Sequence, residues 1–441
     1  MTRPDAGPPP GAMRGLGDPV SPEAPPRAHA PRGEGREVEV HDLRDQAAAM
    51  PEAHTETLTI NMGPQHPATH GVLRVILELE GEVIRDARPV IGYLHTGFEK
   101  EMEYRTYHQN LVFPARIEYL ATFIEETAYA LAAEKLLDIT PPPRAQVARI
   151  ILMELSRIAS HLVWLGTSAI DVNVSSAFMY CFQAREEILD IFEMVSGQRM
   201  MHGYIRIGGL QWDLPEGFAA RVRRFVETIP GRVDEYERLL TDNLIWRKRT
   251  EGIGLLRAQQ AIAYGCTGPV LRGSGVAYDV RKAFPYSGYE QYAFDVPVGR
   301  NGDAFDRYIL RMEEMRQSRR IILQALDRLP DGLVIVDDRK VALPPRAELV
   351  TSMEAVIHQF KLVSEGLRPP AGEVYTAVES PRGEKGYYLV SDGSNRPMRV
   401  RVRSASFNNL QALPVMVRGG TIADIVIAIA SIDIVLGDVD R

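Results

Sequence analysis

Hydrophobic and polar residues follow two different periods along the chain. The shorter one, a period of two residues, predicts strands. Apolar residues alternate with polar ones, or form short β-branched runs, at 58–60, 72–80 and 83–91. A turn at Gly81 and the loop 63–71 separate these segments. We therefore predict an antiparallel sheet at the start of the folded region.

Longer segments carry apolar residues at helical spacing and predict that most of the chain is helical. In chain order they cover 115–137, 144–170, 178–196, 215–240 with a break near Pro230-Gly231, 305–329, and a last helix from about Thr421. The segment 144–170 is apolar nearly all round, which implies burial among other helices. The pattern predicts an α+β protein that is predominantly helical, with a bundle of antiparallel neighbours.

Two segments depart from the helical period. Residues 252–302 are rich in Gly, Tyr and Pro without a stable period, which predicts a long structured loop with a functional or interface role. Residues 374–402 alternate around a turn at Asp392-Gly393, which predicts a small β meander near the C-terminus.

Residues 1–50 differ in composition from the rest. Nine of the chain's 30 prolines lie in the first 31 residues. Such a segment buries too little apolar surface to offset its ordering entropy, so we predict a disordered tail over 1–50 and a single domain over 51–441. The tail has no apolar signal region, and acidic residues interrupt its basic ones, which favours a bacterial cytoplasmic origin over a secretory or mitochondrial one.

The overall composition narrows the class of protein. A net charge of −7 over 441 residues argues against nucleic-acid binding, which needs a basic face. No stretch reaches roughly 20 uninterrupted apolar residues, and the nearest candidate, 422–437, contains Asp424 and Asp433. The sequence predicts a soluble protein or one peripheral to a membrane.

Two cysteines, Cys181 and Cys266, lie far apart, and neither belongs to a Cys-x-x-Cys pair. This count excludes a disulfide framework and a zinc or iron–sulfur site made of cysteines alone. We expect both to be buried structural thiols in a reducing compartment.

His66 and His70 lie in a loop whose backbone is restricted by Pro and Gly. Three interpretations remain open for them. They bind a metal, although no nearby motif adds ligands. They hydrogen-bond the loop closed. Or they deliver protons to a ligand, since imidazole titrates near neutral pH.

Several ionisable residues lie on the predicted helices. Glu154, Arg157 and His161 share one helical face, and Asp171 follows that helix. Buried charges must be paired, so an internal ion-pair network is the default interpretation and catalysis the alternative. On its own, Tyr119 is an ordinary core tyrosine.

Arg116, Glu118 and Tyr119 open the first predicted helix. Gly208-Gly209 and the glycines near 252 form no Gly-x-Gly-x-x-Gly between a strand and a helix, so the chain is not expected to bind a nicotinamide cofactor.

Five longer motifs carry a resemblance to a known family. They are Gly63-Pro-Gln-His-Pro-Ala-Thr-His-Gly71, Ile91-Gly-Tyr-Leu-His-Thr-Gly-Phe-Glu-Lys100, Glu154-Leu-Ser-Arg-Ile-Ala-Ser-His-Leu162, Tyr278-Asp-Val-Arg-Lys-Ala283 and Gly437-Asp-Val-Asp-Arg441. Over 56–441 the chain resembles the D-type subunit of respiratory complex I, the mitochondrial 49-kDa subunit family of proton-pumping NADH:quinone oxidoreductases.

That family is similar in fold to the large subunit of nickel–iron hydrogenases, which hold their metals through two Cys-x-x-Cys pairs. An active hydrogenase is therefore a rival, but two unpaired cysteines cannot supply four thiolates. One pair falls on the segment Asp433–Asp438 here, and the other on Glu118 and Ala121. The resemblance implies that no metal is bound and that a quinone headgroup occupies the emptied cavity.

The resemblance also implies roles for individual residues. His70 and Tyr119 would contact the quinone headgroup and supply its protons, and Asp171 would partner the loop histidine. Arg116 would lie near the terminal iron–sulfur cluster, which the neighbouring B-type subunit holds. Many family members have a histidine near that cluster where this sequence has Met201, followed by His202, so a cluster pH dependence resting on it is in doubt.

The implied partners are complex I subunits of the B, C and I types and the H-type membrane subunit. The implied substrate is a quinone, ubiquinone or menaquinone, and the implied location is the cytoplasmic side of a bacterial inner membrane, where the chain would be peripheral and inactive alone. A scaffold subunit that holds its neighbours without contacting quinone is the remaining alternative.

Overall fold

Helices dominate residues 57–441, which are the residues that the computed structural model describes. The predicted disordered tail falls in 1–56, outside the described residues, and the division into a tail and a single domain stays a prediction. Within the described part the chain forms three small antiparallel sheets, one near each end and a two-stranded one between them. The predicted α+β class with mainly helical content is confirmed.

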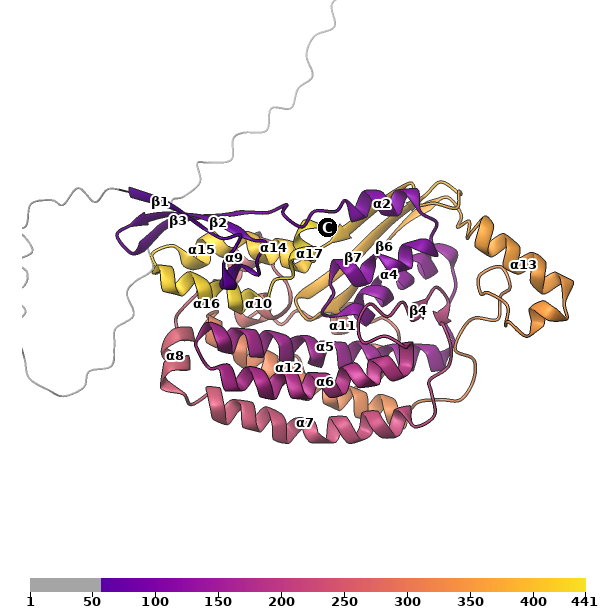
Figure 1. Ribbon diagram of the computed structural model, residues 1–441, viewed down its shortest axis with the longest axis horizontal. Coiled ribbons are helices and arrows are strands. Elements are labelled where there is room, and N and C mark those ends of the chain that lie inside the picture. The colour runs from indigo at the N-terminus through magenta and orange to yellow at the C-terminus, as the bar shows by residue number, and fades with distance from the viewer. Residues whose placement is uncertain (1–56) are drawn as a thin grey trace, which may run out of the picture. The chain divides into compact units, whose positions relative to one another are not determined.

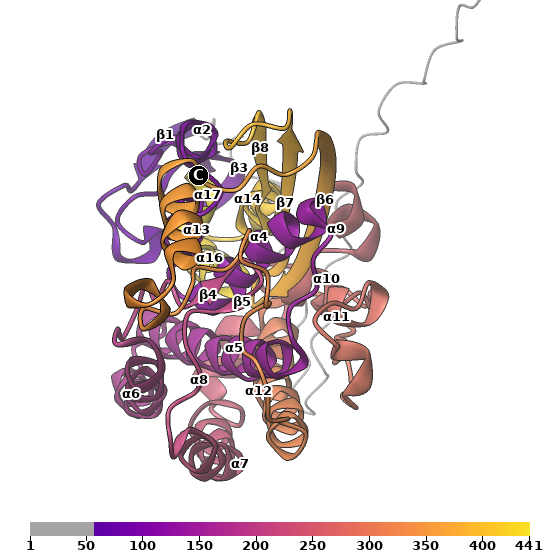
Figure 2. The same ribbon diagram turned by 90° about the vertical axis from the view of Figure 1, so that its right-hand side faces the viewer.

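The long helices form a bundle on one side of 57–441. Figure 1 shows α5 (Pro143–Asp171), α6 (Ser175–Ser196), α7 (Phe218–Leu240) and α12 (Ala304–Asp327) running side by side. In Figure 2 the bundle occupies the lower half, and the strands of the C-terminal sheet lie above it with α4 (Thr122–Leu137) between them. A connection of three residues between α5 and α6 makes these two helices antiparallel, as predicted.

The N-terminal sheet has the order β1-β2-β3, with β1 (Thr57–Met62), β2 (Arg74–Glu80) and β3 (Val83–Val90) antiparallel throughout. Alternate residues of β2 are buried, so the sheet has one face on the core, as the period of two predicts. The three predicted strands are confirmed. They hold the loop that contains His66 and His70 between β1 and β2.

The predicted C-terminal meander is also confirmed. It consists of β6 (Gly372–Ser380), β7 (Gly383–Ser391) and β8 (Arg399–Arg403), paired in that order. Ser380 pairs with Gly383, so Pro381 and Arg382 form the hairpin turn. Hairpin turns usually lie in solvent, but this turn is buried in the protein.

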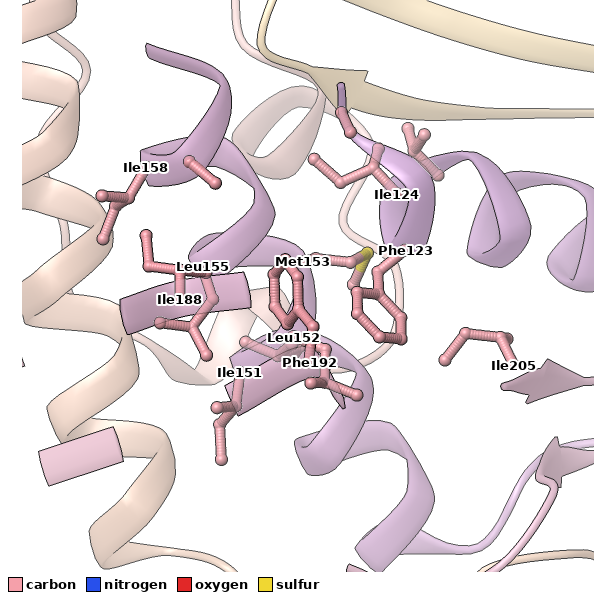
Figure 3. Close-up of a cluster of buried hydrophobic side chains, with 14 of the residues drawn as sticks. Phe123, Ile124, Ile151, Leu152, Met153, Leu155, Ile158, Ile188, Phe192 and Ile205 are labelled. Carbon is pink, nitrogen blue, oxygen red and sulfur yellow. The ribbon is translucent and has the colours of Figure 1, made fainter. Parts of the chain in front are cut away.

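The core lies where α4, α5 and α6 meet. Figure 3 shows its apolar side chains converging from these helices and from β4: Phe123, Ile124, Ile151, Leu152, Met153, Leu155, Ile158, Ile188, Phe192 and Ile205. By length and composition α5 would pass as a membrane span, but 89% of its most apolar window is buried inside the protein. It is the core helix that its all-round apolar pattern predicts.

The predicted helix 115–137 is interrupted, which corrects the sequence prediction. α3 (Pro114–Ile117) ends at Glu118, whose φ of −123° and ψ of 85° are not helical, and α4 begins at Thr122. The carboxylate of Glu118 accepts hydrogen bonds from Ser380 and Arg382 of the meander. These tertiary contacts hold Glu118 and Tyr119 out of the helix.

The predicted break near Pro230 is wrong, because α7 continues through it. Proline at this position cannot donate to the carbonyl of Val226, which loses its helical partner. That carbonyl accepts a hydrogen bond from Nε of Arg319 on α12 at 3.0 Å instead. A side chain from the neighbouring helix thus replaces the missing donor.

The remaining described elements are short. They are η1 (Pro67–Thr69), α2 (Phe98–Tyr104), η2 (Gln109–Val112), β4 (Ile205–Arg206), β5 (Gly209–Leu210), α8 (Leu244–Thr250), α9 (Ala258–Ala263), α10 (Gly268–Gly273), α11 (Val280–Ala283), η3 (Tyr289–Gln291), η4 (Glu348–Val350), α13 (Met353–Ser364), α14 (Ala405–Gln411), α15 (Leu413–Val417), α16 (Ile422–Ile432) and α17 (Leu436–Asp440). The predicted loop 252–302 therefore contains the short helices α9, α10, α11 and η3. The predicted last helix, from about Thr421 into the closing residues Gly437–Arg441, is interrupted: α16 ends at Ile432, Asp433 follows with a positive φ of 58°, and α17 is a separate helix.

Candidate functional site

Hydrogen bonds made by Thr69 and His66 fix the conformation of the loop between β1 and β2. The hydroxyl of Thr69 donates to the carbonyl of Pro64 at 2.9 Å or of His66 at 2.8 Å. Nδ1 of His66 accepts from the amide of Ala68 at 3.2 Å. Of the two histidines, only His66 helps to close the loop, so the loop-closing interpretation does not account for His70.

His70 ends the short helix η1 with a positive φ of 54°, a conformation that few residues other than glycine adopt. Its side chain is exposed at the protein surface. The protein atoms around the imidazole lower its pKa, and the positive charge of Arg382 lowers it further. No hydrogen bond to the ring is found among the described residues.

Tyr119 lies in the break between α3 and α4, half-buried. Burial raises the pKa of its phenol, Arg382 opposes this effect and Glu118 adds to it. A Cβ placed on Gly437 would lie 3.4 Å from the ring, so the tyrosine packs directly on the C-terminal segment. Within 57–441 its hydroxyl has no hydrogen-bond partner.

Arg382 is buried and is the centre of a cluster of hydrogen bonds. It donates to Glu118 at 3.0 Å, to the carboxylate of Asp433 at 3.0 Å and to the hydroxyl of Ser160. Its charge acts on both His70 and Tyr119. Both predicted residues therefore lie within electrostatic range of one buried cluster, which consists of Arg382, Glu118 and Asp433.

A second buried ion cluster adjoins the first. Lys385 lies 2.5 Å from Asp438 and 3.1 Å from Glu125, and Tyr387 donates to Glu125 at 3.1 Å. Burial raises the pKa of Glu125 well above its ordinary value, against the opposing effect of Lys385. Since Glu118 also raises that pKa, the two clusters are electrostatically coupled.

The segments matched to the two hydrogenase cysteine pairs lie together. A Cβ at Gly437 would lie 2.6 Å from the carbonyl oxygen of Ile117, so the C-terminal segment packs on the end of α3. Their side chains Glu118, Asp433 and Asp438 bind Arg382 and Lys385. No group of three or more His, Cys, Asp or Glu side chains in the described residues is arranged to hold a metal ion.

Asp171 does not pair with His70 in this structure. It ends α5, half-buried, and burial raises the pKa of its carboxyl to about 6. Neither a hydrogen bond nor an ion pair to His70 exists in the part of the chain that is described. The predicted pairing of these two residues therefore stays a prediction.

Arg116 and His202 lie in different environments. Arg116 is exposed and donates to the carbonyl of Val112 at 2.7 Å, so its guanidinium is at the surface. His202 is buried, stacks on Phe123 at 4.1 Å, and lies 3.0 Å from the hydroxyl of Ser196. Burial lowers the pKa of His202 to about 4, which makes it a neutral core residue.

The charged face of α5 is the centre of an internal network, which confirms the default interpretation. Glu154 accepts from Arg157 at 3.2 Å, from Arg281 at 3.1 Å and from the hydroxyl of Tyr289 at 2.6 Å. Burial alone would raise the pKa of Glu154, but the two arginines outweigh it and lower it to about 2. His161 lies 2.8 Å from Glu314, which extends the network to α12.

Cys181 and Cys266 are buried and unpaired, as predicted. Burial raises the pKa of Cys181 to about 12 and that of Cys266 to about 11. Both thiols are therefore protonated and structural at neutral pH.

Sequence reasoning missed Arg382 and Lys385. Glu379, Arg382 and Lys385 all lie in or beside the turn between β6 and β7, and exposed charges are ordinary in hairpin turns. The only local signal is that they surround small residues, Ser380 and Gly383, which suit a buried turn.

Comparisons with known proteins agree with one another. Residues 171–441 match the family model described as respiratory-chain NADH dehydrogenase, 49 Kd subunit. The chain is 57% identical over 390 residues to an NADH-quinone oxidoreductase D subunit of Chloroflexus aurantiacus, covering 88% of this chain and 95% of the relative. It is 55% identical over 389 residues to the corresponding D subunit of Geotalea uraniireducens, covering 88% and 100%. It is also 55% identical over 390 residues to the D subunit of a Thermus thermophilus strain, covering 88% and 95%.

Proposed function

The chain belongs to the family of the respiratory-chain NADH dehydrogenase 49 Kd subunit, and from this premise we propose that it forms much of the quinone-headgroup site of a proton-pumping NADH:quinone oxidoreductase. The enzyme is the assembled complex, and this chain is one of its subunits. Its neighbours are subunits of the B, C, I and H types. The assembly lies in a bacterial inner membrane, with this chain peripheral on the cytoplasmic side.

One observation carries the proposal: the charge of Arg382 acts on both His70 and Tyr119, and neither side chain has a hydrogen-bond partner in 57–441. A quinone has two carbonyl oxygens, and each must receive a proton on reduction. An imidazole and a phenol with uncommitted hydrogen-bonding groups are the donors that such a substrate requires. Both side chains also remain partly accessible, so a ligand can reach them.

The base of the site supports the same chemistry. Glu118 and Asp433 both pair with Arg382, so none of the three needs the ligand as a partner. They fix the backbone that carries Tyr119, and the guanidinium of Arg382 acts electrostatically on both donors.

Electrons and protons reach the quinone by different routes. The iron–sulfur cluster of the neighbouring subunit supplies electrons, and Arg116 at the surface of α3 would lie near it. Protons move only over hydrogen-bond distances, so the donors must touch the carbonyl oxygens. Because the pKa of His70 is lowered, the imidazole is neutral at pH 7 and must be protonated before it can donate.

We propose that Asp171 favours the protonated form of His70. A carboxylate brought close to the imidazole favours the imidazolium and orients the ring, as carboxylates do beside other catalytic histidines. The carboxyl of Asp171 has no other partner in the described chain. The proposal requires the two side chains to approach each other when quinone binds.

Co-purification tests the proposal as a whole. A tagged copy of this chain, expressed in its own host, should purify from membranes together with NADH-oxidising, quinone-reducing activity. Purification without such a complex would overturn the proposal. Recovery in a complex in which substitutions at His70 and Tyr119 leave quinone reduction unchanged would favour the scaffold alternative.

A further inference from the structure

Arg185 on α6 is a buried guanidinium without a partner. It is only 8% exposed, yet no hydrogen bond or ion pair to it is found in the described part of the chain. Its Nε atom in particular is buried and unsatisfied. Burial lowers its pKa, Glu186 opposes this effect without forming an ion pair with Arg185, and Arg199 adds to the effect.

The acidic residues nearest to Arg185 on α6 are paired with other arginines. Glu186 binds Arg199 at 2.6 Å, and Glu187 binds Arg232 at 2.5 Å. Asp190 binds Arg221 at 3.1 Å. The fold therefore pairs these acids with other arginines and leaves Arg185 without a direct ion pair in the described residues. A buried charge is tolerated at low cost only when an opposite charge accompanies it.

Aromatic side chains lie on one side of Arg185. Phe178 and Phe182 stack at 4.1 Å, and the guanidinium of Arg185 lies 5.9 Å from the ring of Phe182, which continues this row along α6. On α5 the close packing at Gly166 faces these two rings. Ile170, one turn from Gly166 on α5, is 46% exposed.

We propose that this face of the α5–α6 pair binds an apolar segment of a neighbouring subunit whose Asp or Glu carboxylate pairs with Arg185. The inference rests on the proposed function in taking the partner to be a subunit of the same complex. The charge of Arg185 determines which kind of segment can bind. An apolar segment without an acid would leave the guanidinium of Arg185 unpaired and more deeply buried. α6 lies between α5 and α7 in Figure 1 and at the outer edge of the bundle in Figure 2.

Cross-linking in the assembled complex tests the pairing. Arg185→Lys keeps the charge and provides an amine, which a carbodiimide joins to a contacting carboxylate as an amide. Mass spectrometry should find position 185 of this variant linked to an Asp or Glu of another subunit. The matched control is Arg199→Lys, which should link to Glu186 of the same chain.

The outcomes separate this inference from the proposed function. If the control link forms and position 185 gives no link, or links only within this chain or to a second copy of it, the inference is overturned alone. If the wild-type chain is absent from any NADH:quinone oxidoreductase, the proposed function falls and the inference falls with it.

Stability of the isolated full chain provides a second test. Arg185→Met removes an uncompensated buried charge, so it should raise the unfolding temperature of the chain alone. The same change should weaken association with the partner subunit by on the order of 100-fold. The control Arg232→Met breaks an existing ion pair and should lower stability without weakening association. A lower unfolding temperature for Arg185→Met would show that Arg185 has a purely internal role, and would overturn the inference.

Discussion

Arg382 and Glu118 are separated by 264 residues in sequence and meet at 3.0 Å in the buried base of the site. The contact joins the turn between β6 and β7 to the break between α3 and α4. That break keeps Tyr119 out of a helix, and the residue is half-buried.

Replacing Tyr119 with Phe should lower quinone reduction while the complex still assembles. The change removes one proton donor and keeps the ring that packs near Gly437. Loss of one preorganised hydrogen bond costs about 2–4 kcal/mol, or roughly 30- to 1000-fold in rate, if proton donation is rate-limiting. Quinone reduction by purified complex measures the effect.

Two controls accompany this variant. NADH oxidation by an artificial acceptor that takes electrons upstream should not change. Tyr104→Phe, which alters a tyrosine that is 58% exposed on α2, should reduce quinone at the normal rate. A wild-type rate for Tyr119→Phe would place the headgroup elsewhere.

Asp171→Asn should stabilise the isolated chain and impair the complex. Its pKa is raised to about 6, so the folded state binds more protons than the unfolded state between about pH 4 and 6. Burial of this carboxylate therefore destabilises the fold progressively as pH rises through that window, and fully above it. Removing the charge should add about 1–2 kcal/mol to the free energy of unfolding at pH 7, with little gain at pH 4.

The loss of quinone reduction caused by Asp171→Asn should depend on whether His70 is present. If the carboxylate acts through the imidazole, the double variant with His70→Ala should reduce quinone no more slowly than His70→Ala alone. The quinone-reduction rates of the two single variants and the double variant give the coupling free energy between Asp171 and His70. Strictly additive losses would show that the two residues act independently.

Glu154→Gln should destabilise the chain by about 3–5 kcal/mol, because it leaves two buried arginines short of a carboxylate. The pKa of Glu154 is lowered to about 2, so its contribution is present above the ordinary glutamate range and is lost as pH falls from about 4.5 toward 2. Urea unfolding measures the change. Glu251→Gln, which breaks an exposed pair with Arg247, should cost less than about 1 kcal/mol.

Metal analysis tests the absence of a metal centre in the isolated chain. With no cysteine pairs, the pure folded chain should contain no stoichiometric iron, nickel or zinc. About one bound metal ion per chain in elemental analysis would contradict the proposed site.

Deleting residues 1–40 should change assembly and quinone reduction little, because their composition predicts no packed structure. The same two measurements on the truncated chain check this. Loss of the complex would show that the segment docks a partner.

Local periodicity predicted the elements well where local and tertiary preferences agree. The strands of both larger sheets and the buried helix α5 follow directly from their patterns of apolar residues. The predictions went wrong where a distant side chain replaced a local interaction, as Arg319 does for the carbonyl that Pro230 leaves unpaired. The helix break at Glu118 has the same origin, since its cause lies in the meander.

The site was predictable only in part. His70 and Tyr119 were identified through a family resemblance, and the structure adds that they share Arg382. No periodicity in the sequence indicates that a charged hairpin turn is buried. Three-dimensional burial, not sequence spacing, distinguishes Arg382 from an ordinary surface arginine.

The interior network around Glu154 also limits how the sequence can drift over evolutionary time. Its carboxylate is shared by Arg157, Arg281 and Tyr289, so no single substitution there is neutral. A lineage that loses the acid must lose a matching cation at nearly the same time, and the intermediate is unstable. The positions of this network should therefore change together or remain fixed, which links residues of α5 to a loop more than a hundred positions away in sequence.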